Sequence, residues 1–165
     1  MWWAGKDRGF VQSEHNDALG IYQTHLDEVG RAIEQGDFDG YAQHYAQAHQ
    51  FETVVGNMSI TNPVALRLFF YTLCLQLERH DLPTLYRVCK SAEFINPTTI
   101  FGSHQTRLIR QDAIVAESFS ARCVLKLWGN RWRLSRMHVH EGAKALPAVV
   151  MSRVLSRQKR QGQRG

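Results

Sequence analysis

Glu117 stands out in the sequence because it interrupts an apolar row. Val115, Phe119, Ala121 and Cys123 alternate with other residues around it and would share its face of a strand. A carboxyl group on a buried face must be paired, hydrogen-bonded or protonated, and such a group can act as a general acid or base. We therefore predict that Glu117 is catalytic. The alternative is that it lies at the strand's end and reaches solvent or an arginine.

His138 and His140 form a His-x-His pair whose rings would project from one face of a strand. We predict that His138 assists Glu117 in proton transfer. Two histidines and a carboxylate can also hold a metal ion, but the spacing fixes no third ligand, so we expect no metal and no cofactor. The alternative places both histidines on the outer face of a sheet or in a dimer interface.

Five other side chains are candidates for contact with a ligand. They are Tyr45, Tyr86, Phe94, Phe119 and His104. Each tyrosine could place its hydroxyl in a cavity, although a tyrosine at such a position is more often a core aromatic with a satisfied hydroxyl. The sequence contains no Walker loop, Gly-x-Gly-x-x-Gly, Gly-x-Ser-x-Gly or His-Glu-x-x-His motif. Nucleotide-dependent and classical hydrolase functions are therefore not indicated.

The elements that must position these residues are helices first and strands afterwards. Helical spacing from Leu19 to Ile33 predicts a first helix capped by Asn16 or Asp17, and Asp37 can cap a second. Asn62-Pro63 begins a largely buried helix that extends to about residue 80. Short strands are predicted on either side of Gly56-Asn57, and long strands at 84–94, 99–109, 115–127 and 131–140.

In the strand that begins at Thr84, alternation assigns Tyr86, Val88, Ala92 and Phe94 to one face and Arg87 to the other. This order of elements predicts an α+β fold: a cone-shaped, curved antiparallel sheet wrapped around three N-terminal helices, with an extra basic C-terminal helix. Residues 1–16 would form an N-terminal arm, 17–142 the cone-shaped pocket domain, and 143–165 the basic helix or tail. The open mouth of the cone is a usual place for a small ligand.

The chain resembles the nuclear-transport-factor-2-like superfamily, also called SnoaL-like or ketosteroid-isomerase-like, over roughly Asp17 to His140. The resemblance rests on the element order, on the turn Gln35-Gly36-Asp37-Phe38-Asp39-Gly40, on Tyr45-Ala46 before Phe51-Glu52, and on the hairpin Gly129-Asn130-Arg131-Trp132-Arg133-Leu134. Members of this superfamily include isomerases, dehydratases, polyketide cyclases, small dioxygenase subunits and inert binding modules. The resemblance therefore implies a fold and leaves the function open.

The resemblance to ketosteroid isomerases can be tested residue by residue. Their general base would fall on Thr53, which is no carboxylate, and their oxyanion-hole tyrosine would fall on Val29, which has no donor. Steroid-isomerase chemistry is therefore not expected. Glu52 is adjacent to Thr53 but should point to the opposite face, unless the register of the strand differs by one residue.

The composition is that of one soluble domain, with 165 residues, 44% hydrophobic residues and a net charge of +5. Six basic residues and no acidic one lie in 143–165, so this tail carries the excess charge. The tail could contact nucleic acid or another anionic partner, or stay solvated. With no apolar run of membrane-spanning length and no signal peptide, the expected location is cytoplasmic. The three cysteines are expected to be reduced and buried.

Two functions remain open on the sequence. One is a pocket protein that binds a small apolar molecule, either as a carrier or as a lyase- or isomerase-type enzyme. The other is a non-catalytic, dimeric assembly module resembling the small subunits of ring-hydroxylating dioxygenases. In both, an exposed apolar sheet face would form a homodimer. The two differ in whether Glu117 and His138 both face a closed cavity. If both point outward from the sheet, the assembly module is favoured.

Overall fold

The computed structural model describes residues 4–140 and 142–164, and the side chains from residue 17 onwards. The helices are α1 (Ala4–Gln35), α2 (Phe38–Ala42), α3 (Pro63–Glu78) and α4 (Leu146–Arg164). The strands are β1 (Tyr45–Thr53), β2 (Gly56–Ile60), β3 (Thr84–Asn96), β4 (Thr99–Arg110), β5 (Ala113–Ile114), β6 (Phe119–Trp128) and β7 (Arg131–Val139). This is the predicted α+β order, with an additional short strand β5.

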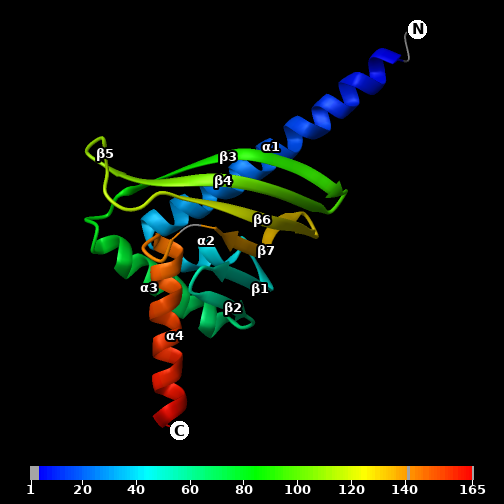
Figure 1. The fold of residues 1–165 in the computed structure, drawn as a ribbon. Coiled ribbons are helices and arrows are strands. Elements are labelled where there is room, and N and C mark those ends of the chain that lie inside the picture. Colours follow the sequence, from blue (N-terminus) through cyan, green and yellow to red (C-terminus); the bar gives the residue numbers. More distant parts are fainter. Residues whose placement is uncertain (1–3, 141, 165) are drawn as a thin grey trace.

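The sheet has the order β2-β1-β7-β6-β4-β3, and β5 pairs with β4. The long strands β3, β4, β6 and β7 pair in antiparallel fashion, as predicted, and β1 pairs with β2 in the same way, whereas β1 is parallel to β7. The long strands β3, β4 and β6 arch across α1, while the start of α1 and the end of α4 extend beyond the sheet (Figure 1). The result is the predicted curved sheet around helices.

Helix α1 starts earlier than the sequence predicts, because it extends from Ala4 through the expected capping position at residues 16 and 17. Residues 4–16 therefore belong to this helix, and residues 1–3 of the predicted arm lie outside the described part. Most of the predicted apolar face of the helix is buried against the sheet: Tyr22, Leu26, Val29 and Ile33 are at most 8% exposed, and Leu19 is half-buried. This face forms one wall of the core.

Strand β3 contains a bulge between Cys89 and Ser91, where one extra residue shifts the pairing with β4. The bulge reverses which side chains face inward. Ala92 is buried after it, as predicted, but Arg87 faces the interior before it, and Tyr86 is 53% exposed. The uniform alternation predicted for this strand is therefore wrong in its first half.

The predicted long strand 115–127 is interrupted, since β5 ends at Ile114 and β6 begins at Phe119. Glu117 lies in the connecting segment and is exposed, with its Oε1 close to the backbone of Gly142. The expected buried position of Glu117 is therefore not observed, because no strand pairing holds it on the apolar face.

Helix α4 is amphipathic and packs against α3 with one apolar side. The buried residues of this side are Leu146, Ala148, Val150, Met151 and Val154. The opposite side exposes Arg153, Arg157 and Arg160 to solvent. The predicted basic C-terminal helix therefore forms and continues to Arg164, beyond the expected end near residue 157. None of the described helices is long and apolar enough to span a bilayer.

Candidate ligand site in the cone interior

A cavity of about 60 Å³ lies between the helices and the inner face of the sheet. Helices α1 and α3 contribute Val29, Ile33, Phe69 and Leu73, and the sheet contributes Leu85, Phe119 and Met137, among others. Leu146, Pro147 and Val150 of α4 line it as well, so the C-terminal helix covers the interior of the cone. The walls are mostly apolar, as is typical of small-molecule sites.

A short polar row crosses one wall of this cavity. The row consists of Arg87 on β3 and Thr106 on β4, which are paired directly, and the apolar Phe119 on β6 is the next residue across the sheet. All of them line the cavity, and Arg87 is the one charged residue among the described lining residues. The hydroxyl oxygen of Thr106 is buried and has no hydrogen-bond partner among the described residues. The row therefore gives the apolar cavity a polar end.

The guanidinium of Arg87 is half-buried and makes two long contacts with neutral acceptors. Nη2 lies 3.4 Å from Nε2 of His104, and Nη1 lies 3.5 Å from the carbonyl oxygen of Leu26. None of the ion pairs among the described residues involves Arg87. The Gln23 amide on α1 fixes the backbone of the strand, donating to the Arg87 carbonyl at 3.0 Å and accepting from the Cys89 N–H at 2.8 Å. The arginine is held in place without a counter-ion.

His104 is neutral in this environment, because burial, followed by the charges of Arg87 and His25, lowers its pKa to about 2. Arginine can only donate, so Nε2 of His104 acts as the acceptor and Nδ1 carries the proton. Nδ1 then donates to the hydroxyl oxygen of Tyr22 at 2.7 Å. Burial raises the pKa of Tyr22 well above its ordinary value, so this buried chain of groups stays uncharged apart from Arg87.

Two tyrosines, Tyr41 and Tyr45, also line the cavity. Their rings lie 4.4 Å apart. Burial raises the pKa of Tyr45 to about 12, so its hydroxyl is a neutral donor. These groups can bind a polar atom of a ligand but do not supply a base near neutral pH.

The predicted ligand-contacting residues fall in different places. Tyr45 and Phe119 line the cavity. His104 is buried behind it and contacts Arg87. Phe94 is half-buried and packs against Trp132, with ring centroids 6.0 Å apart, and Tyr86 is exposed on the outer face.

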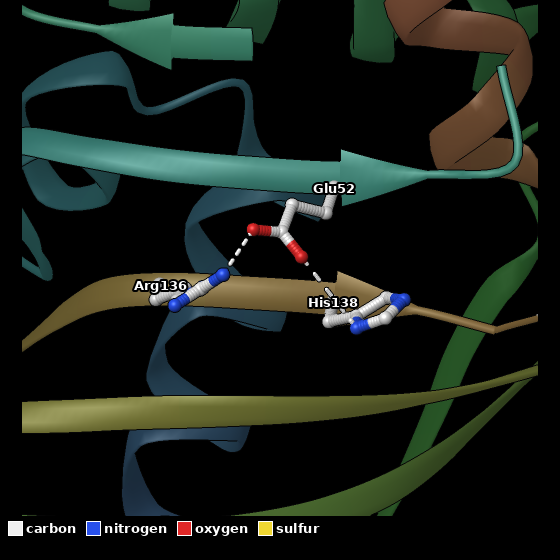
Figure 2. A network of polar contacts seen from close by, with 3 residues as sticks. All are labelled: Glu52, Arg136 and His138. Carbon is white, nitrogen blue, oxygen red and sulfur yellow. Dashed lines mark hydrogen bonds and ion pairs between the residues drawn. The ribbon is translucent and has the colours of Figure 1, made fainter. Parts of the chain in front are cut away.

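The predicted catalytic pair does not meet in the cavity. His138 lies on the outer face of the sheet, its side chain 46% exposed, with Nδ1 3.6 Å from Oε2 of Glu52. Figure 2 shows the Glu52 carboxylate between Arg136 and His138, bonded to both. The ring of His140 lies 4.2 Å from that of His138. Neither Glu117 nor His138 lines the interior, and their catalytic role stays a prediction without geometric support.

The positions that the ketosteroid isomerases use for catalysis are also accounted for. Val29 lines the cavity, as the resemblance implies for that position. Thr53 donates its hydroxyl proton to the sulfur of Met151 on α4 at 3.4 Å, and Glu52 points outward, opposite to it. No Asp or Glu is found among the described lining residues. The described lining of this cavity therefore offers no counterpart of their carboxylate base.

Sequence reasoning missed Arg87 and Thr106 as site residues. Arg87 was assigned to the outer face because alternation was extended through the bulge. The sequence did contain one signal. Leu85, Arg87 and Cys89 are spaced two residues apart and would share one face of a strand. The next inward residue, Ala92, follows Cys89 by three residues, which indicates one inserted residue, as in a bulge. Thr106 gave no such signal, because an inward threonine in a strand is ordinary.

The sequence matches no protein-family model and no curated protein. Solved structures do match. An NTF-2-like protein of unknown function from Shewanella oneidensis aligns with TM-score 0.59 and 14% identity, covering 74% of this chain and 98% of that one. A protein of unknown function from Mycobacterium tuberculosis aligns with TM-score 0.60 and 14% identity, covering 93% and 92%. A ketosteroid isomerase-like protein from Erwinia carotovora aligns with TM-score 0.55 and 10% identity, covering 76% and 96%. The chain thus has the NTF2-like cone fold.

Proposed function

We propose that this protein, built on the NTF2-like cone, binds a small and largely apolar molecule in the cavity beneath α4. The observation that carries the proposal is an apolar cavity with one polar end, formed where Arg87 and Thr106 meet. A cavity needs roughly 10–15 Å³ of free volume to hold a single water molecule. The observed volume of about 60 Å³ therefore suits a ligand of only a few non-hydrogen atoms, unless α4 moves outward.

Binding is favoured over catalysis by the residues that reach the cavity. Proton transfer of the lyase or isomerase type needs a base in contact with the ligand. The described lining residues include no carboxylate and no histidine, and Glu117 and His138 are exposed. A carrier or sensor needs only the shape of the cavity and its polar end.

Methyl NMR titration with short-chain probes such as propionamide and propionate tests the proposal. The methyl groups of Met137 and Val150 line the cavity, whereas Val64 is 79% exposed at the start of α3 and serves as a control. We expect saturable shifts at Met137 and Val150 with at least one probe and none at Val64. Shifts no larger in the cavity than at Val64, for every probe tested, would refute the proposal.

A second candidate function is a non-catalytic dimeric module. It is supported by the exposed positions of Glu117 and His138, which the sequence analysis associates with such a module, and by the outer face of the sheet. Large apolar side chains are exposed there: Tyr86 by 53%, Ile95 by 60%, Phe101 by 38% and Trp128 by 47%. The same face carries Arg122 and Lys126, which would repel their copies across a symmetric interface, whereas Arg136 on this face is paired with Glu52. This candidate therefore requires a dimer that strengthens as salt screens that repulsion.

Sedimentation equilibrium at low and high salt tests the second candidate. Phe101→Asp should shift the chain to monomer, while Val64→Asp, which places the same charge on α3 away from the sheet, should not. A wild-type chain that is monomeric at both salt concentrations excludes a dimer through this face.

A further inference from the structure

We infer that the ligand of the cavity is a short carboxylate, recognised by the guanidinium of Arg87 and the hydroxyl of Thr106. The inference rests on the proposed function and names the chemical class of its ligand. It starts from two side chains on directly paired positions of neighbouring strands. Among the described residues, the Arg87 guanidinium has no anionic partner and the Thr106 hydroxyl has no hydrogen-bond partner.

The charge of Arg87 requires an explanation because a half-buried cation is normally paired. The two contacts of its guanidinium, at 3.4 and 3.5 Å, are to neutral acceptors and are long for hydrogen bonds. The positive charge of Arg87 acts on buried side chains nearby, since it contributes to lowering the pKa of both His25 and His104. An anion in the cavity would supply the missing partner.

Thr106 indicates where that anion would bind. The residue is 1% exposed and its Oγ1 has no hydrogen-bond partner among the described residues. A buried hydroxyl left unsatisfied is costly, and a bound acceptor would relieve that cost. The planar guanidinium matches a carboxylate in shape, and a neighbouring hydroxyl can donate to the same group. No described carboxylate lines the cavity to compete for these donors.

The rest of the cavity restricts the remainder of the ligand. The aromatic rings of Phe51 and Phe119 and the side chain of Met137 line it, so the part of the ligand beyond the carboxylate should be apolar. With a volume of about 60 Å³, the cavity fits a monocarboxylate of about the size of propionate.

The test compares propionate with propionamide, which has a similar shape but no charge, at constant ionic strength set with sodium chloride. Dissociation constants come from the methyl shifts of Met137 and Val150. We expect propionate to bind at least roughly 10-fold more tightly than propionamide, as a charge-assisted hydrogen bond provides. Equal affinities would overturn the inference while leaving the proposed function intact. Binding of neither probe would refute both.

Variants assign the effect to the two residues. Arg87→Gln should weaken propionate roughly 10- to 100-fold and leave propionamide unchanged, whereas Arg107→Gln, an exposed arginine of β4, is the matched control and should change neither. Thr106→Val keeps the shape of the side chain, so it provides a folded variant if Arg87→Gln unfolds. It should weaken propionate several-fold. Unchanged propionate affinity in a folded Arg87→Gln, or in Thr106→Val, would overturn the inference.

Discussion

The ring of Tyr22 on α1 lies directly against the backbone of Gly102 on β4. A Cβ placed at residue 102 would be 2.5 Å from one ring carbon of Tyr22 and 2.8 Å from the carbonyl oxygen of Ser91. The absence of a side chain at Gly102 therefore lets Tyr22 approach the sheet. This contact positions the hydroxyl of Tyr22 for its hydrogen bond to His104, and His104 in turn contacts Arg87.

Gly102→Ala should destabilise the fold, because the added methyl group overlaps with Tyr22. Overpacking of this kind costs roughly 1–3 kcal/mol. Gly20→Ala is the control: nothing lies within 4 Å of a Cβ there, and alanine is favoured over glycine in a helix by roughly 1 kcal/mol. Urea unfolding should therefore show opposite signs for the two substitutions. A Gly102→Ala protein as stable as the wild type would contradict the close approach of Tyr22.

Stability should fall on acidification below neutral pH because buried histidines resist protonation in the folded state. Burial, followed by the charges of His44 and Arg87, lowers the pKa of His25 to about 3, and the pKa of His104 is lowered to about 2. In the unfolded chain each titrates near 6.5. As the pH falls from about 6.5 toward about 3, the unfolded state takes up protons that the folded state does not, so unfolding becomes easier.

The expected loss is roughly 1.4 kcal/mol per pH unit for each such histidine, measured by urea unfolding between pH 7 and pH 4. His25→Leu removes one of them and should reduce the slope by about that amount. Above pH 7 the slope of the variant should match that of the wild type. An unchanged acid slope in His25→Leu would mean that His25 is protonated within the fold.

The general architecture could be predicted from the sequence because it depends on local signals. Helical spacing located the buried face of α1 from Leu19 to Ile33, and Asn62 caps α3 as predicted, accepting from the N–H of Ala65 at 2.9 Å. The hairpin at Gly129, with φ of 63°, also follows from its residue type. These features depend on residues a few positions apart.

The site could not be predicted in the same way, because it depends on interruptions of regular pattern. The bulge in β3 turns Arg87 inward, and the break before β6 exposes Glu117. Both depend on pairing between distant strands, which periodicity along one strand does not report. Glu117 was chosen for its apolar neighbours, and those neighbours belong partly to a segment that is not a strand.

Substitution of the predicted catalytic pair should leave ligand binding intact. Glu117 and His138 are exposed and do not line the cavity, so Glu117→Gln and His138→Gln should change the propionate affinity less than two-fold and the unfolding free energy within about 0.5 kcal/mol. The NMR titration described above provides the measurement. A large loss of propionate affinity in either variant would indicate that Glu117 or His138 belongs to the binding site, as the sequence predicted, and would contradict a site formed by the cavity residues alone.

The two sides of α4 should have separable effects. Deleting residues 143–165 removes the buried Leu146, Val150 and Met151 and uncovers the cavity, so the free energy of unfolding should fall by several kcal/mol and binding of the dye ANS should rise. Neutralising the exposed side with Arg153→Gln, Arg157→Gln and Arg160→Gln should leave both nearly unchanged.

The neutralised variant also tests whether the basic tail contacts an anionic partner. If the exposed side of α4 binds polyanions, the wild-type chain should elute from a heparin column at higher salt than this triple variant. The variant makes fewer basic contacts with the polyanion, so its binding releases fewer counterions. Urea unfolding of the variant checks that its fold is intact, so that a lower elution salt is not caused by unfolding. If the two proteins elute at the same salt concentration, the only role of α4 supported by the structure is to cover the interior of the cone. The prediction of an anionic partner would then be wrong.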